Sequence, residues 1–127
     1  MSKYPECKVF VHPRGAAHLV DPTNLLAAAL KQFKGELPPY GEVHCVSPDA
    51  IIQSKDDMII DLGGVQIQVV WTPGHSTHSQ SFFEIENRVL FVGDAAGQIF
   101  YDYVLPTSPP PFNPDHTIES IHRIMSL

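Results

Sequence analysis

The alternation of hydrophobic and polar residues predicts β-strands in the middle of the chain. In the segment 65–71, Val65, Ile67, Val69 and Trp71 alternate with Gln66, Gln68 and Val70, a period of two that is typical of a half-buried strand. Shorter apolar runs at 51–52, 58–60, 82–86 and 89–92 are separated by polar or glycine-containing turns at 56–57, 63–64 and 87–88. We therefore expect small antiparallel sheet pieces from residue 50 onwards, with a tight hairpin at Gly63-Gly64.

Helical periodicity is confined to two other segments. Asp21-Pro22-Thr23-Asn24 contains several helix-capping residue types and precedes an Ala- and Leu-rich run that Gly35 ends, which predicts a helix over 22–34. A second helix is predicted over 114–126, with an apolar stripe of Ile118, Ile121, Ile124 and Met125. The remaining expectations are strands at 8–12 and 42–46, a turn at Arg14-Gly15 and irregular loops at 37–41 and from 101 to 114.

Composition narrows the possible partners and surroundings. The chain has 127 residues, of which 43% are hydrophobic, enough for one domain that buries about two thirds of its unfolded surface. Its net charge of −6 and its eight scattered Lys and Arg residues argue against a nucleic-acid or anionic-membrane partner. The sequence has no apolar run of about 18 residues and no secretory segment, so we expect a cytoplasmic protein. Cys7 and Cys45 lie in apolar runs and are expected to be buried, reduced thiols.

Candidate chemistry follows two of the predicted strands. Trp71-Thr72-Pro73-Gly74 leads to His75, and Leu90-Phe91-Val92-Gly93 leads to Asp94. If both strands belong to one sheet, they deliver an imidazole and a carboxylate to the same edge, a ligand pair that suits zinc, iron or manganese. The alternative is that the two turns are unrelated, since each motif by itself is common.

These motifs resemble a known family. Thr72-Pro73-Gly74-His75 and Phe91-Val92-Gly93-Asp94 look like the third and fourth metal-binding motifs of the metallo-β-lactamase-fold hydrolases, and the resemblance extends to 11–22, 40–42, 61–64 and 106–111. It implies an α/β (α+β) fold that is part of an αββα sandwich, with a mixed or antiparallel sheet and the helices 22–34 and 114–126 on one face.

The sequence also departs from that family. It has no His-x-His-x-Asp-His motif and no further ligand histidine near its end; its histidines are His12, His18, His44, His75, His78, His116 and His122. Both ends of the chain look like cuts. We therefore expect residues 1–127 to form a single incomplete domain, the central and C-proximal part of the family fold.

The resemblance implies site roles for a few residues. In the complete family, His75 would bind one metal ion, zinc or another divalent metal, and Asp94 would bridge two metal ions. With these two ligands alone, this chain would bind metal weakly or not at all. His78 would tune the turn, while His12, Tyr101 and Asp102 could support the ligands or lie at the rim of the site. No catalytic residue can be assigned on this chain alone. His78, Asp102 or His116 could complete a rebuilt site, since catalytic zinc normally has about three protein ligands.

Three hypotheses on function remain open. The first is a fragment of, or a truncated, metal-dependent hydrolase, in which a metal-bound hydroxide attacks an ester, thioester or similar bond of a small-molecule substrate. Such a chain would be inactive alone and would need the missing N-terminal half. The second is a non-catalytic binding or assembly module that kept the fold and self-associates. The third is a nucleophile pair of Ser76, Thr77 or Ser79 with His75 or His78.

Overall fold

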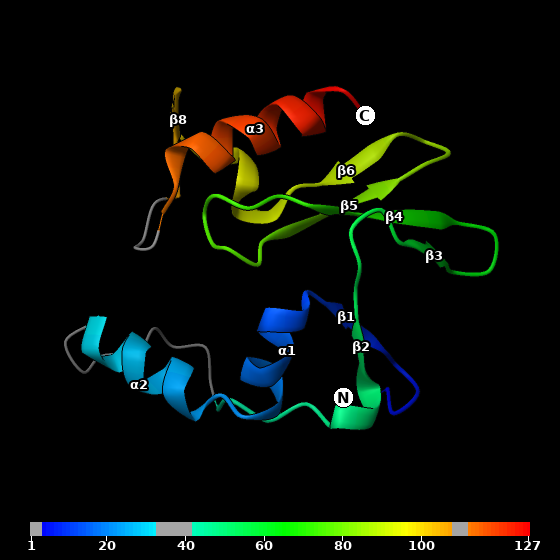
Figure 1. Cartoon of the computed structure of the whole chain (residues 1–127), viewed down its shortest axis with the longest axis vertical. Helices are drawn as coiled ribbons and strands as arrows, with labels where there is room; N and C mark the ends of the chain where they lie inside the picture. Colours follow the sequence, from blue (N-terminus) through cyan, green and yellow to red (C-terminus); the bar gives the residue numbers. More distant parts are fainter. Residues whose placement is uncertain (1–3, 33–41, 108–111) are drawn as a thin grey trace. The chain divides into compact units, whose positions relative to one another are not determined.

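The chain forms two compact units, residues 1–53 and 54–127 (Figure 1). The computed structural model describes residues 4–32, 42–107 and 112–127. The predicted loop at 37–41 and the end of the predicted helix, at 33–34, lie outside the described residues. The expectation of a single domain over 1–127 stays a prediction, and each unit is described by itself.

The first unit is a parallel strand pair with two helices. Strands β1 (Val9–Val11) and β2 (Ile51–Gln53) pair in parallel, with Val9 opposite Ile51. Helices α1 (Pro13–Val20) and α2 (Thr23–Gln32) and the short 3₁₀ turn η1 (Pro48–Ala50) lie between them in the chain. The expectation of antiparallel pieces is therefore wrong for 51–52. A parallel pair needs a long crossover connection, and the two helices provide it.

Helix α1 was not predicted from the sequence. The imidazole Nδ1 of His12 accepts a hydrogen bond of 3.1 Å from the backbone N–H of Arg14, and Pro13 occupies the first helical position. Both features are typical of helix starts. The turn expected at Arg14-Gly15 is thus wrong, because these residues form the first turn of α1.

Two further expectations in this unit are wrong. Residues 42–46 form no strand. Instead, the backbone N–H of Val46 donates a 2.8 Å hydrogen bond to the carbonyl oxygen of Leu19, near the end of α1. A helix end offers no ladder of strand partners. Cys7 and Cys45 are free and exposed, not buried, because each lies in an irregular segment without an alternating buried face.

The second unit is built on a four-stranded antiparallel sheet. Its order is β3 (Ile59–Asp61), β4 (Gln66–Trp71), β5 (Gln80–Glu84) and β6 (Val89–Phe91). The predicted hairpin at Gly63-Gly64 is confirmed: both glycines have positive φ, and Asp61 Oδ1 accepts hydrogen bonds of 2.8 and 3.1 Å from their N–H groups. The period-two pattern of β4 ends at Val69 and Val70, which are both 0% exposed, so this strand is covered on both faces near its carboxyl end.

Helix α3 (Pro114–Met125) packs against the turn that follows β4. Its start is capped by Asn113 Oδ1, and Ser120 Oγ donates a 2.7 Å hydrogen bond to the carbonyl oxygen of Pro73. The expected apolar stripe is only partly right, since Ile118 and Met125 are 54% and 80% exposed. The buried face is centred on the small residue Ser120 instead, because the 72–75 turn approaches the helix closely.

A third small sheet replaces part of the loop expected from residue 101. The 3₁₀ turn η2 (Gly93–Ala96) leads into a hairpin of β7 (Gln98–Phe100) and β8 (Tyr103–Leu105), with Tyr101 and Asp102 at its tip. The mixed α/β class predicted from the sequence is confirmed. The joint placement of α2 and α3 on one face stays a prediction, since they belong to different units. No helix in the described parts of the chain is long and apolar enough to cross a membrane.

Arg123 ties α3 to the turn before β3. Its guanidinium donates hydrogen bonds of 2.8 Å to Asp56 and 2.8 Å to Asp57, and one of 3.2 Å to the carbonyl oxygen of Trp71. Desolvation alone would raise the pKa of Asp56, but the bonds from Arg123 and from the Trp71 N–H outweigh it, so this pKa lies below its usual value.

The depressed pKa predicts a pH-dependent contribution of Asp56 to stability. The contribution is fully present above the unfolded-state pKa of about 4 and is lost as the pH falls through the lower folded-state value. Asp56→Asn should therefore lower the free energy of unfolding at pH 7 by about 1 kcal/mol or less, because the pair is partly screened by solvent. Urea unfolding of both proteins should show this difference shrinking at pH 3. A difference that does not change with pH would contradict the assignment.

Candidate metal centre

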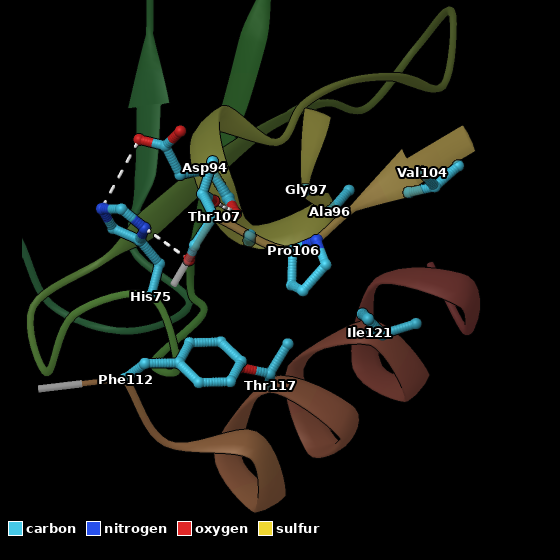
Figure 2. A pocket seen from close by; sticks show the side chains of 11 residues that line it. His75, Asp94, Ala96, Gly97, Val104, Pro106, Thr107, Phe112, Thr117 and Ile121 are labelled. Atoms are coloured by element: carbon cyan, nitrogen blue, oxygen red, sulfur yellow. Dashed lines mark hydrogen bonds and ion pairs between the residues drawn. The ribbon is translucent and has the colours of Figure 1, made fainter. Parts of the chain in front are cut away.

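The order of the strands brings the two predicted ligand turns together. Strands β4 and β6 each pair antiparallel with β5, so they run parallel to each other and end at the same edge of the sheet. From that edge the chain continues through Pro73 and Gly74 to His75, and through Gly93 to Asp94 in η2. Figure 2 shows the two side chains pointing toward one another. The predicted convergence of His75 and Asp94 is therefore what the structure shows.

The orientation of the His75 ring is fixed by a backbone carbonyl. His75 Nδ1 lies 2.9 Å from the carbonyl oxygen of Thr107, and since a carbonyl can only accept, Nδ1 carries a proton (Figure 2). The other nitrogen, Nε2, lies 3.7 Å from Asp94 Oδ2. In the neutral ring Nε2 carries a lone pair, and this lone pair is directed toward a carboxylate.

Thr107 also holds the second turn. Its side-chain Oγ1 donates a 2.8 Å hydrogen bond to the backbone carbonyl oxygen of Asp94. One residue therefore contacts both candidate ligands, one through its backbone and the other through its hydroxyl. Sequence reasoning missed Thr107; the only available signal was its place in the family-like segment 106–111.

A buried hydroxyl pair supports the edge of the sheet below the site. Ser81 Oγ lies 3.2 Å from the carbonyl oxygen of Val92 and donates to it, and Thr72 Oγ1 lies 3.1 Å from Ser81 Oγ. Because the single Ser81 proton goes to Val92, Thr72 must be the donor in the second bond. Both residues are almost fully buried, so these bonds link the ends of β4, β5 and β6.

The His75 and Asp94 side chains are too far apart for a hydrogen bond, but close enough to be ligands of one ion. The 3.7 Å between His75 Nε2 and Asp94 Oδ2 exceeds the usual range for a hydrogen bond. It is compatible with two ligands of one ion, each about 2 Å from it. The described residues contain no group of three or more His, Cys, Asp or Glu side chains that could hold a metal. Within that part of the chain, His78, Asp102 and His116 therefore do not complete the site.

Of the other predicted site residues, three belong to the second unit and one to the first. His78 is in the same loop, where its backbone N–H donates to Ser76 Oγ at 3.3 Å. Tyr101 and Asp102 are at the tip of the β7–β8 hairpin, and Tyr101 is 84% exposed. His12 belongs to the other unit and caps α1. Supporting or rim roles for these four residues stay predictions. His116 and His122 are exposed on α3.

The hydroxyl groups beside His75 close the turn. Ser76 Oγ and Ser79 Oγ lie 2.9 Å apart, and Ser79 Oγ also accepts a 3.2 Å bond from the Ser76 N–H. The His75 ring, in contrast, contacts Thr107 and faces Asp94. This arrangement gives no support to a hydroxyl nucleophile activated by His75.

A cavity of about 150 Å³, called here the side cavity, opens beside the pair (Figure 2). The residues that line it are His75, Asp94, Ala95, Ala96, Gly97, Val104, Pro106, Thr107, Phe112, Thr117 and Ile121. Apart from the pair itself, these residues are mostly apolar.

Comparisons with known proteins agree with this fold. Residues 3–124 match the family model of the metallo-beta-lactamase superfamily. This match covers almost the whole chain, so the chain belongs to the metallo-β-lactamase superfamily.

Similar proteins are longer than this chain. It is 35% identical over 79 residues to the metallo-beta-lactamase fold-containing protein ST1585 of Sulfurisphaera tokodaii, covering 62% of this chain and 30% of that protein. The crystal structure of ST1585, an archaeal member of the superfamily from Sulfolobus tokodaii, matches with a TM-score of 0.80 and 27% identity. That match covers 98% of this chain and 50% of ST1585, so the chain spans about half the length of this relative.

Two other solved structures show the fold alone. The metallo-beta-lactamase family protein TTHA1429 of Thermus thermophilus has a TM-score of 0.60 and 21% identity, and the match covers 91% of this chain and 42% of TTHA1429. TTHA1623, solved in a di-iron-bound form, has a TM-score of 0.59 and 23% identity, with coverage of 98% of this chain and 54% of TTHA1623.

Gly74 should be the least replaceable position in the His75 turn. It has φ +146°, and a Cβ atom there would lie 2.8 Å from Thr117 Cα and 2.9 Å from Thr117 N, which are backbone atoms of α3. Gly74→Ala should therefore lower the free energy of unfolding by about 2–4 kcal/mol, through backbone strain plus overpacking.

Gly63→Ala is the matched control. Gly63 also has positive φ, +83°, but nothing lies within 4 Å of a Cβ built there. Its cost should be limited to strain, about 1 kcal/mol. Chemical denaturation of Gly74→Ala and Gly63→Ala measures the free energy of unfolding that each variant loses. Equal losses would show that the close approach of Gly74 to α3 is unimportant.

Proposed function

We propose that His75 and Asp94 supply two ligands of a divalent-metal site in a metal-dependent hydrolase that acts on an ester, thioester or similar bond of a small-molecule substrate. The observation that carries this proposal is the Nδ1–H···O bond to Thr107, which directs the Nε2 lone pair toward Asp94 Oδ2 at 3.7 Å. Superfamily membership and the di-iron-bound form of TTHA1623 support it.

Each residue of the centre has a distinct task in this proposal. His75 would bind zinc, or another divalent metal, through Nε2, and the Thr107 carbonyl oxygen would fix the ring and raise its basicity as a ligand. Asp94 would offset the positive charge of the metal and bridge two ions. A bound metal would lower the pKa of its water and polarise the scissile carbonyl group.

We propose further that the chain alone is inactive. Two protein ligands are too few for a catalytic zinc ion, which normally has about three. The sequence has no His-x-His-x-Asp-His motif, so the remaining ligands would come from a polypeptide that carries the N-terminal half of the site. A cytoplasmic location belongs to the same proposal, because free thiols such as Cys7 and Cys45 suit a reducing compartment.

A non-catalytic assembly module is the second candidate. Two observations favour it: the His75–Asp94 pair gains no third ligand among the described residues, and apolar side chains are exposed on the second unit. On the edge strand β6, Phe91 is 59% exposed, and on β7 Ile99 and Phe100 are 81% and 61% exposed. Such surfaces on a sheet edge favour self-association. Sedimentation of the chain as a strict monomer at all concentrations would count against this candidate.

Metal content and zinc titration test the first proposal. The metal content of protein purified without chelator shows whether any metal is retained. Zinc should bind weakly in calorimetry, because the chain supplies only two ligands. His75→Ala and Asp94→Ala should each weaken zinc binding by at least about tenfold, because either change removes one of two ligands. His122→Ala, an exposed histidine on α3, is the matched control and should leave binding unchanged. Equal zinc affinity in His75→Ala and the unaltered chain would overturn the proposal.

A further inference from the structure

The side cavity has one polar end. His75 and Asp94 form that end, and the wall beyond them comes from η2, from β8 and from α3, through small or aliphatic residues such as Ala96, Val104 and Ile121 (Figure 2). A ligand lying in it would meet the candidate metal centre with one end and hydrocarbon with the rest. This is the usual layout of a small-molecule site, in which a few polar groups fix the orientation of an otherwise apolar ligand.

The hydroxyl groups in the wall have no proton to offer a ligand. Thr117 Oγ1 donates a 2.9 Å hydrogen bond to the carbonyl oxygen of Asn113, and Thr107 Oγ1 donates to the carbonyl oxygen of Asp94. Each hydroxyl has one proton, so both are already used. A phosphate or a sugar placed away from His75 and Asp94 would therefore lose hydration without gaining donors, which is unfavourable. Asp94 would also repel an anionic ligand in the absence of a metal.

The size of the cavity limits the length of the apolar part. A volume of about 150 Å³ is similar to that of apolar cavities that take up benzene. A chain of about four to six carbon atoms has a comparable volume and would fill this space.

We propose that the side cavity binds a short aliphatic acyl group of about four to six carbons, with its carbonyl oxygen directed toward His75 and Asp94. This inference rests on the proposed function, because it takes the pair as the reactive end, and it narrows the substrate to short-chain acyl esters or thioesters. Binding of the aliphatic chain in the side cavity does not depend on a metal. It can therefore be tested separately.

The test uses n-pentanamide, a neutral carbonyl compound with an apolar tail, and acetamide as its short counterpart. Binding to the full chain without added metal is followed by the NMR signals of the Val104 and Ile121 methyl groups. Pentanamide should shift both sets of signals in a saturable way. The chain should bind pentanamide about two- to fourfold more tightly than butanamide, which has one methylene fewer, as expected for burial of a methylene in a half-open cavity. No saturable shift, or equal affinities for acetamide and pentanamide, would overturn the proposal.

Two variants locate the binding. Ala96→Leu places a larger side chain at the cavity and should weaken pentanamide binding at least tenfold. Ala28→Leu makes the same change at an exposed position of α2 and should have no effect. Thermal unfolding of Ala96→Leu checks that this variant is folded. A further variant, Ile121→Ala, enlarges the cavity and should shift the preference to an amide with a longer chain. Unaltered pentanamide binding in folded Ala96→Leu would contradict the proposal.

A third variant separates this proposal from the metal site. His75→Ala should lose zinc binding but keep most of its affinity for pentanamide, since the apolar wall is intact. Failure of the metal proposal would appear as zinc binding that His75→Ala does not reduce, while failure of the cavity proposal would appear as a missing response of the Val104 and Ile121 methyl groups.

Discussion

The hydrogen bond from His75 Nδ1 to the Thr107 carbonyl oxygen determines what the rest of the site can do. A backbone carbonyl cannot exchange roles with the ring, so it sets which nitrogen of His75 is protonated and which one faces Asp94. Without this bond, the imidazole could turn or change tautomer. The unprotonated nitrogen would then no longer be held 3.7 Å from Asp94 Oδ2. Thr107 adds to this by holding the backbone of Asp94 with its hydroxyl.

This bond requires the two ligand turns to be placed accurately, and the sheet provides that placement. Strands β4 and β6 end at one edge because both pair antiparallel with β5. The buried Ser81 hydroxyl connects these strand ends, and Gly74 lets the His75 turn lie directly against α3. Buried hydroxyls that are fully hydrogen-bonded restrict a structure to one arrangement, so the site depends on residues that contact neither ligand side chain.

Local sequence patterns predicted the parts of this fold that depend on neighbours in the chain. These local features are the alternation along β4, the Gly63-Gly64 hairpin and the order of strand, turn and candidate ligand before His75 and Asp94. The two candidate ligands meet because β4, β5 and β6 follow one another in sequence and pair antiparallel. Thr107 was not predictable in this way. It lies 32 residues from His75, and it acts through a backbone carbonyl, which any residue type possesses. The parallel β1–β2 pair and the exposed Cys45 depend likewise on long-range packing that periodicity does not encode.

We propose that Thr107 holds His75 with a free Nε2 lone pair directed at a metal position shared with Asp94. The most direct test is to record the ¹⁵N NMR signals of the His75 imidazole, assigned with His75→Ala, before and after one equivalent of zinc. We expect a protonated Nδ1 and an unprotonated Nε2, with the Nε2 signal moving on zinc addition and Nδ1 staying protonated. A ring protonated at Nε2, or an Nε2 signal that zinc leaves unchanged, would contradict it.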